Sequence, residues 1–317
     1  MAQPVDPALQ PDVRTSFQSE ISSNKTKSVA LIAVVFLVLA ALLYVIAAIY
    51  TGGTSIAFLI FGLLFSGVYV ATTYFYGDQI VLSTTGAKPI DLRNPKHVFL
   101  KNTVENLAFA ARLPKTPAIY VIESGALNAF ATGRDPEHAS IAVTTGLLNT
   151  LDRNELEGVI AHEISHVSNY DIRFSLLVAC MVGLIAILSH MFLRSMMFGG
   201  GGGSSDRKGG GALPLILIGI ALAIFAPIIV RMVQAAVSRK RESLADATGA
   251  KLTRYPEGLA SALEKIKAQE SRKDAPKLNV SEAESHLFFS DPVKSHLDGL
   301  FATHPPLDER IKTLRGM

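Results

Sequence analysis

Two long apolar segments open the chain, with a short polar link between them. They run over residues 29–50 and 55–76, and neither contains a charged residue. The link is Thr51-Gly52-Gly53-Thr54. A helix needs roughly 20 residues to cross a hydrocarbon core of about 30 Å, so each segment is long enough to span. We therefore predict a transmembrane hairpin over residues 28–76, preceded by a tail over residues 1–27.

A secretory signal peptide is the alternative interpretation of the first apolar segment. The tail before it is long and mixed in charge, and no small-residue cleavage site precedes a soluble region. The whole chain of 317 residues is 49% hydrophobic and only 18% charged, with a mean hydropathy of +0.32. This balance is too apolar for an ordinary soluble domain, so we expect retained membrane anchors.

Two further apolar segments, at residues 174–198 and 212–237, lie within residues 174–237. They are interrupted by His190, Arg194 and Arg231. An ionisable group inside a bilayer is costly unless it lies near the end of a span or is paired, and both arginines lie near segment ends. We predict a second transmembrane hairpin here. A pair of buried helices in a soluble domain remains the alternative.

The placement of lysine and arginine predicts the orientation. Arg14, Lys25 and Lys27 precede the first hairpin, whereas its internal link has no charge. Because positive residues favour the cytoplasmic side, the N-terminal tail should face the cytoplasm. Four spans then return residues 77–173 and residues 238–317 to that same side, so both termini should be cytoplasmic.

The residues between the two hairpins show helical and extended patterns. Residues 102–112 have a helical pattern, and short apolar runs at 118–122, 126–131 and 140–144 are bounded by proline, glycine or serine. Such boundaries are typical of strands. We predict an α+β fold, mainly helical with a small sheet, which is assembled from the two blocks on either side of the second hairpin.

An H-E-x-x-H motif at residues 162–166 is the clearest chemical signal. Asp152 and Glu155 are spaced like a capping box, so the helix should start about two and a half turns before the motif. Residues four apart share a helix face, which lets both imidazoles bind one zinc ion. Zinc lowers the pKa of a bound water to about 7, and Glu163 can take its proton. The motif predicts peptide-bond hydrolysis; a chance histidine pair on a polar stripe is the alternative.

A hydrolytic zinc site uses three protein ligands and leaves one position open, so the motif needs a third ligand. Glu242 lies in a helical-looking stretch, and Asp246 follows four residues later on the same face. A carboxylate placed there can hold a ligand imidazole by its other nitrogen. The alternative is a surface helix in which Glu242 pairs with a neighbouring arginine or lysine.

The net charge and the cysteine content limit which other classes of function are compatible with the chain. The net charge of +3 and the pI near 8.9 are explained by basic residues next to the spans, and we expect no nucleic-acid partner. The single cysteine, Cys180, lies in an apolar segment and allows no intrachain disulfide, which fits a reducing compartment. The glycine-rich stretch at 199–211 lacks the ending of a phosphate loop, and we interpret it as a linker.

The motifs together resemble those of the HtpX membrane metalloproteases, which share a peptidase superfamily with the CAAX prenyl endopeptidases. The resemblance implies a zincin-like catalytic domain, with one zinc ion per chain bound by His162, His166 and Glu242. It also implies that Glu163 is the general base and that Asp246 supports a ligand imidazole. The matching residues, in order, are His162-Glu163-Ile164-Ser165-His166 with Asn169, Arg241-Glu242-Ser243-Leu244-Ala245-Asp246, and Thr303-His304-Pro305-Pro306 with Arg310-Ile311.

The resemblance implies two more roles. The segment that includes Asn128, Ala129 and Phe130 matches an edge strand on which an extended substrate backbone pairs, as in β-augmentation; an ordinary internal strand is the alternative. His304 matches a histidine near the zinc that stabilises the oxyanion. The alternative for His304 is a histidine at a helix start beside two prolines.

The predicted function is that of a zinc endopeptidase in a bacterial inner membrane, which cleaves misfolded or damaged membrane proteins at the cytosolic face. The expected partners are protein substrates and the lipid bilayer, and homo-oligomerisation is left open. The alternative is a transporter or metal-handling membrane protein, which should carry ionisable groups at mid-span depth. Only His190 approaches that position, so we favour the enzyme.

Overall fold

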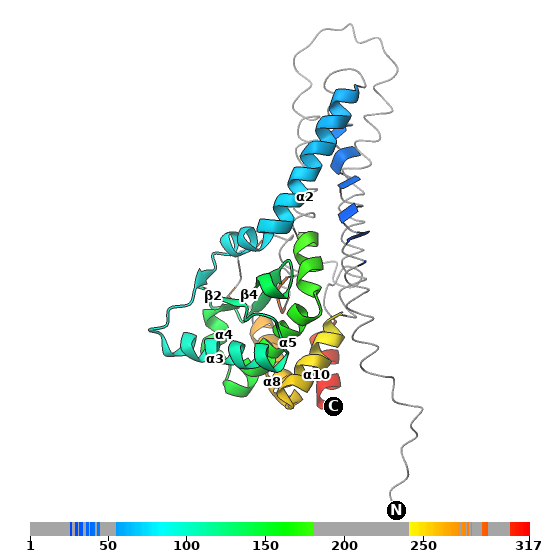
Figure 1. Cartoon of the computed structure of the whole chain (residues 1–317). Coiled ribbons are helices and arrows are strands. Elements are labelled where there is room, and N and C mark those ends of the chain that lie inside the picture. The colour runs from blue at the N-terminus through cyan, green and yellow to red at the C-terminus, as the bar shows by residue number, and fades with distance from the viewer. Residues whose placement is uncertain are drawn as a thin grey trace, which may run out of the picture.

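The computed structural model describes residues 55–179, 241–272, 287–290 and 305–317, with isolated positions between 26 and 44 and between 274 and 280. One long helix rises from a compact body of helices around a small sheet (Figure 1). The second predicted hairpin lies outside the described residues, except for its first few positions. The predictions for Cys180, His190 and His304 also lie outside them.

Helix α2 (Ile56–Thr84) contains the second apolar segment and continues beyond it. Ser55 caps its start, because its side chain accepts a hydrogen bond from the Ala57 amide. Among the described residues, α2 is the one helix long and apolar enough to cross a membrane, with a mean hydropathy of 2.0. The boundary drawn at residue 76 therefore falls inside a continuous helix.

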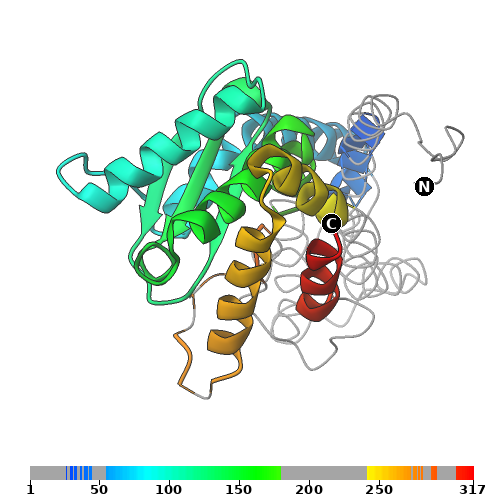
Figure 2. The same ribbon diagram turned by 90° about the horizontal axis from the view of Figure 1, so that it is seen from below.

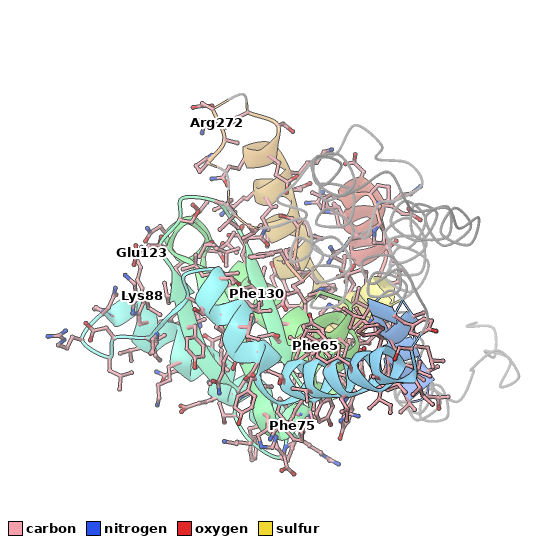
Figure 3. All side chains as sticks on the ribbon, turned by 90° about the horizontal axis from the view of Figure 1, so that it is seen from above. Phe65, Phe75, Lys88, Glu123, Phe130 and Arg272 are labelled. Atoms are coloured by element: carbon pink, nitrogen blue, oxygen red, sulfur yellow. The ribbon has the colours of Figure 1, made fainter. Side chains whose placement is uncertain are left out.

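The exposed face of α2 is apolar, and its packed face is made of small residues. Large hydrophobic side chains such as Leu64 and Val68 are two-thirds exposed, whereas Gly62 is buried against Ala40 of the first apolar segment. Figure 3 shows Phe65 and Phe75 of this helix on the side of the molecule away from Arg272. An uncovered apolar face of this length fits contact with lipid.

The sheet has four strands in the order β1-β2-β4-β3. Strands β2 (Ala118–Ile122) and β4 (Ala139–Thr144) are parallel, whereas β1 (Lys88–Pro89) and β3 (Ala129–Gly133) are antiparallel to their neighbours. Strand β3 therefore lies at one edge of the described sheet.

The predicted strands are present, but β3 begins later than the apolar run at 126–131. The amide of Leu127 donates to the Gln269 side chain, and the amide of Asn128 donates to Thr144 Oγ1. Since side chains already satisfy these two backbone groups, regular pairing with β4 starts at Ala129.

The predicted helix at 102–112 is also present, but it starts earlier. Helix α3 runs over Pro95–Ala110, because Asn94 caps it and Pro95 suits its first turn. It ends before Arg112, which has a left-handed φ of 56°.

Helix α5 (Arg153–Ser168) lies at the centre of the compact body, between the sheet and the C-terminal helices (Figure 2). The predicted capping box is present: Asp152 accepts from the Glu155 amide, and the Glu155 side chain accepts from the Asp152 amide. Helix α8 (Pro256–Glu270) packs closely on α5, and a Cβ at Gly158 would come within 2.7 Å of the Leu259 nitrogen. The C-terminal helix α10 (Leu307–Arg315) covers α8.

The remaining described elements are short and connect the sheet to α5. They are the 3₁₀ helix η2 (Pro136–His138) before β4 and the helix α4 (Thr145–Thr150) after it. A further helical stretch at 171–179 follows α5 and runs across the boundary drawn at residue 173. Val81 and Leu82, at the end of α2, pack with Leu176 of this stretch in a second hydrophobic cluster, which includes Phe130 and Ala142 of the sheet.

Candidate metal centre

Helix α5 presents two imidazoles at one point on its buried face. His162 and His166 are one turn apart, and their Nε2 atoms lie 3.1 Å from each other. The rings meet edge to face at 87°. His162 is fully buried, and His166 retains slight exposure toward the pocket. The spacing of the motif therefore brings both Nε2 atoms to the same place.

Glu242 reaches this point from the helix at 241–253. One of its carboxylate oxygens lies 3.5 Å from His162 Nε2, and the other lies 3.5 Å from His166 Nε2. Gly249 permits the close approach of the two helices, since a Cβ there would lie 3.1 Å from the His162 backbone nitrogen. All three ligand atoms lie within 4.8 Å of one another.

A carboxylate lies next to the Nδ1 atom of each imidazole, on the side of the ring away from Nε2. Asp246 Oδ1 lies 2.9 Å from His162 Nδ1, and Asp171 Oδ2 lies 3.0 Å from His166 Nδ1. Although Asp246 Oδ1 and His162 Nδ1 are close, the angles between them do not meet hydrogen-bond geometry. In the neutral rings, each Nδ1 proton would face a carboxylate, leaving a lone pair on each Nε2.

This donor set fits a metal ion. Two neutral Nε2 atoms cannot hydrogen-bond to each other, whereas tetrahedral zinc with Zn–N bonds of about 2.05 Å places two nitrogens about 3.3 Å apart, close to the spacing here. The surrounding charges also fit, because four carboxylates and two guanidiniums leave two negative charges for a divalent cation to balance. Within the described residues these buried groups are Glu163, Asp171, Glu242, Asp246, Arg241 and Arg310.

Without a cation, the surrounding carboxylates favour the protonated forms of the imidazoles. Burial disfavours the charged form of His166, but the neighbouring carboxylates Asp171 and Glu242 outweigh it and raise its pKa to about 10. The pKa of His162 is raised in the same way: burial opposes the shift, while Asp246 and Glu242 drive it. The site is thus built to hold positive charge.

Two arginines stabilise the carboxylates. Arg310, from α10, donates to both oxygens of Asp246 at 2.8 and 2.7 Å, and its Nη1 lies 3.5 Å from Glu242. Arg241 lies 4.0 Å from Asp171 and stacks over Phe174. Burial tends to raise the pKa of Asp246, but the charge of Arg310 and the contact with His162 lower it to about 2. Asp246 is therefore ionised at neutral pH.

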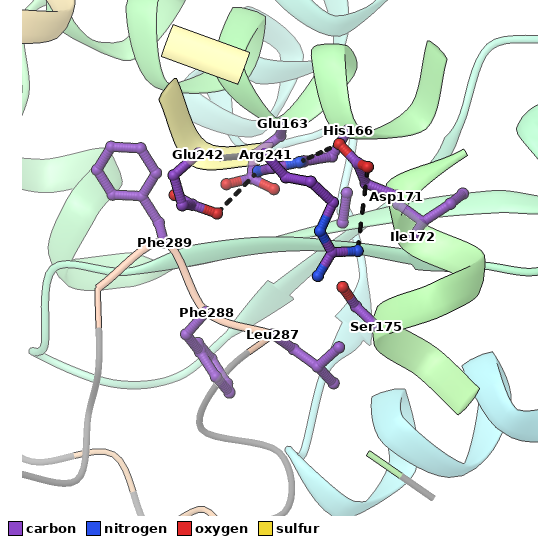
Figure 4. Close-up of a pocket in the computed structure, with 11 residues that line it drawn as sticks. Glu163, His166, Asp171, Ile172, Ser175, Arg241, Glu242, Leu287, Phe288 and Phe289 are labelled. Atoms are coloured by element: carbon purple, nitrogen blue, oxygen red, sulfur yellow. Dashed lines mark hydrogen bonds and ion pairs between the residues drawn. The ribbon is translucent and has the colours of Figure 1, made fainter. Parts of the chain in front are cut away.

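Glu163 lies beside the two imidazoles and is 2% exposed. Burial raises its pKa, and Glu242 adds to the shift, while His162 and His166 oppose it. The backbone amide of Ala131, on β3, donates a hydrogen bond to its carboxylate. Figure 4 shows Glu163, His166 and Glu242 around one pocket. A buried carboxylate with a raised pKa beside a cation site is well suited to proton transfer.

The other predicted site residues are placed differently. Asn128 immediately precedes the edge strand β3, Ala129 is its first residue, and the Phe130 ring is fully buried. Ala131, the last residue of the predicted edge segment, is the residue of this strand that lines the pocket.

Sequence reasoning missed further members of the site. Asp171 lies just past the end of α5, and its only signal was a carboxylate five residues after His166. Arg310 was quoted within a motif but received no role. The segment Leu287–Phe289 also lines the pocket, and no pattern in the sequence marks it.

The supporting carboxylates should tune metal affinity. Asp246→Asn and Asp171→Asn each keep the shape of the side chain but remove the charge behind one imidazole. We expect each to weaken metal binding roughly 10- to 100-fold, because the ligand nitrogen becomes less basic and less firmly oriented. Competition with a chromogenic chelator measures this. Asp274→Asn, at an exposed position, is the control, and unchanged affinity in both site variants would refute these roles.

Comparisons with known proteins identify the family of this chain. The peptidase family M48 profile matches residues 96–317. A Protease HtpX homolog from Caldanaerobacter subterraneus subsp. tengcongensis is 46% identical over 82% of this chain and 84% of its own. Another, from Dictyoglomus thermophilum, is 40% identical over 95% of both chains. The crystal structure of Ste24p from S. mikatae aligns with 93% of this chain and 66% of its own, at 23% identity and a TM-score of 0.49. The family profile and the two HtpX homologues show that the chain belongs to peptidase family M48, where it resembles the HtpX proteases.

Proposed function

We propose that this chain is a zinc endopeptidase held in a bacterial inner membrane, with its catalytic domain facing the cytoplasm. One observation carries the proposal: two imidazoles and a carboxylate converge within 4.8 Å, and a buried glutamate lies beside them. The membership of family M48 supports a metallopeptidase. Zinc is favoured among divalent ions because two histidines and one carboxylate are the ligands of many hydrolytic zinc sites.

The proposed chemistry assigns a role to each group. Zinc bound by His162, His166 and Glu242 would supply Lewis acidity toward the scissile carbonyl and lower the pKa of the attacking water. Glu163 would take the proton of that water and return it to the leaving amine. Its raised pKa favours this double role, because the protonated form is then a stable intermediate state of the side chain.

Substrate binding would use the free edge of β3. An extended peptide can add to an exposed strand edge through main-chain hydrogen bonds. The Ala131 amide already points from this edge toward Glu163, so a peptide paired there would pass the catalytic group. We also keep His304 as a proposed stabiliser of the oxyanion.

We further propose that the substrates are misfolded or damaged membrane proteins. The lower end of α2 packs into the catalytic body, and Gly77 lies in direct contact with Leu176. Arg134 and Arg173 stack on the aromatic rings of Phe75 and Tyr74 at the same level. Aromatic and basic side chains favour the membrane interface, so the site would lie close to the bilayer surface.

Loss of the first hairpin should separate membrane from soluble substrates. A chain that begins at residue 72 keeps Val81 and Leu82, which pack in the domain core. We expect its cleavage of a membrane-anchored substrate in proteoliposomes to fall roughly 10- to 100-fold, because α2 no longer fixes the site at the bilayer surface beside the substrate. Cleavage of soluble unfolded casein should change little. Equal losses for both substrates would contradict the proposed membrane delivery.

A further inference from the structure

The free edge of β3 is already occupied by another part of this chain. The Asn128 carbonyl accepts a hydrogen bond from the Thr144 amide on the β4 side. Because backbone groups alternate along a strand, the Ala129 carbonyl points the opposite way, to the free edge. There it accepts a hydrogen bond of 2.8 Å from the amide of Phe289. The residue at 289 therefore pairs with β3 as an added strand would.

The Asn128 side chain holds the next residue of the same segment. Its amide nitrogen donates to the Ser290 carbonyl at 2.8 Å, and its oxygen accepts from the Ser290 amide at 3.1 Å. Both main-chain groups of one residue are thus bound by a single carboxamide. This contact recognises a peptide backbone, whatever its side chain, as a substrate-binding residue must.

Two aromatic rings of the segment fill the space beside the catalytic groups. The Phe289 ring packs edge-on against His162 at 4.9 Å, beneath the Arg310 guanidinium. The Phe288 ring packs against Phe130 at 4.9 Å. Both phenylalanines are at most 2% exposed. The backbone pairing and the side-chain packing therefore hold the segment in the site together.

The remaining space is too small for a substrate. Figure 4 shows Leu287 and Phe288 on the side of the pocket opposite Glu163 and His166, with the Phe289 ring beside Glu242. The cavity that they close has a volume of about 20 Å³, which is room for about one water molecule. A peptide cannot reach Glu163 along β3 while residues 287–290 keep this position.

We propose that residues 287–290 form an internal pseudosubstrate, which must leave the β3 edge before a peptide binds. This inference rests on the proposed endopeptidase function. It adds that residues 287–290 and a substrate peptide compete for the same strand edge. The apparent affinity for a peptide is reduced by the fraction of molecules in which the edge is open. The segment also indicates the preferred ligand: an extended chain with consecutive aromatic residues, read through its backbone by Asn128.

Ser290 offers a matched pair of variants for the test. Ser290→Pro removes the amide that donates to Asn128 and leaves Asn128 itself intact, whereas Ser290→Ala keeps that amide. Phe288→Ala loosens the segment independently, through its packing on Phe130. The probe is an N-terminally fluorescein-labelled synthetic peptide that repeats residues 287–292. Its binding to the full-length, metal-loaded chain is followed by fluorescence anisotropy, with cleavage measured in parallel.

The proposal predicts that Ser290→Pro and Phe288→Ala bind the peptide about three- to tenfold more tightly than the wild type. This is the effect expected when the segment loses one hydrogen bond or packing contact to the β3 edge. Ser290→Ala should bind like the wild type. Equal or weaker binding by both loosened variants, with metal content and thermal unfolding unchanged, would show that the segment is a fixed wall and overturn the proposal. Tighter binding without cleavage by any form would support the pseudosubstrate and refute the endopeptidase function.

Discussion

Glu163→Gln should retain the metal and lose nearly all peptidase activity. The amide has the size of the carboxylate and can still accept the hydrogen bond from Ala131, so the site should keep its shape. It cannot take a proton from water, and general acid–base catalysis typically contributes about 10²- to 10⁴-fold to the rate. We therefore expect casein cleavage to fall by about that factor, with metal content by mass spectrometry unchanged.

Glu157→Gln is the matched control for this variant. Glu157 lies earlier on the same helix, α5, and is half-buried away from the cluster. Its substitution changes the net charge equally, so its activity should remain near that of the wild type. If Glu163→Gln cleaved casein as fast as Glu157→Gln while holding the same metal, Glu163 would not be the general base.

Glu242→Ala should lose both the metal and the activity. Glu242 supplies one of the three ligand atoms and is the only one that does not come from α5. Two histidines alone leave a site that binds divalent ions far more weakly, because each ligand adds to the affinity. After dialysis we expect close to no zinc per chain and no measurable cleavage.

The neighbouring Ser243→Ala tests whether this loss is specific. Ser243 is exposed on the same helix, so its substitution should leave the zinc content and the activity near wild-type values. A Glu242→Ala chain that kept stoichiometric zinc would show that the third ligand is another residue. In that case His304 would be the first candidate to examine.

Local signals in the sequence predicted the core of the site. The capping pair Asp152 and Glu155 placed the start of α5, and helical spacing then placed His162 and His166 on one face. Glu242 followed from the need for a third ligand, and the structure brings it to the imidazoles. These residues could be predicted because the chemistry of a metal ion demands particular groups at particular spacings.

Tertiary contacts explain what the sequence could not show. Arg310 supports Asp246 from the far end of the chain, and that pairing exists only after α10 has packed on α8. Asp171 needs the left-handed turn at Tyr170 to direct it back to His166. The segment at 287–290 reaches β3 across more than a hundred residues, and neither periodicity nor spacing encodes such a partner.

In the fold, too, local sequence patterns predicted the elements, whereas tertiary contacts determine where they end. Apolar patterning predicted α2 and the three longer strands, whereas their ends depend on side chains elsewhere. Leu127 is excluded from β3 because Gln269, on α8, takes its amide. Helix α2 passes residue 76 because its last two turns pack Val81 and Leu82 into the domain instead of facing lipid. Hydropathy alone does not distinguish these two environments.

Titration of the metal-stripped wild-type chain with zinc tests the central claim most directly. Bound zinc and casein cleavage are measured on the same samples in detergent. The proposed function predicts that cleavage is absent at the start and rises in proportion to occupancy until one zinc ion is bound per chain. Cleavage by the metal-free chain, or a fully loaded chain with no cleavage, would contradict it.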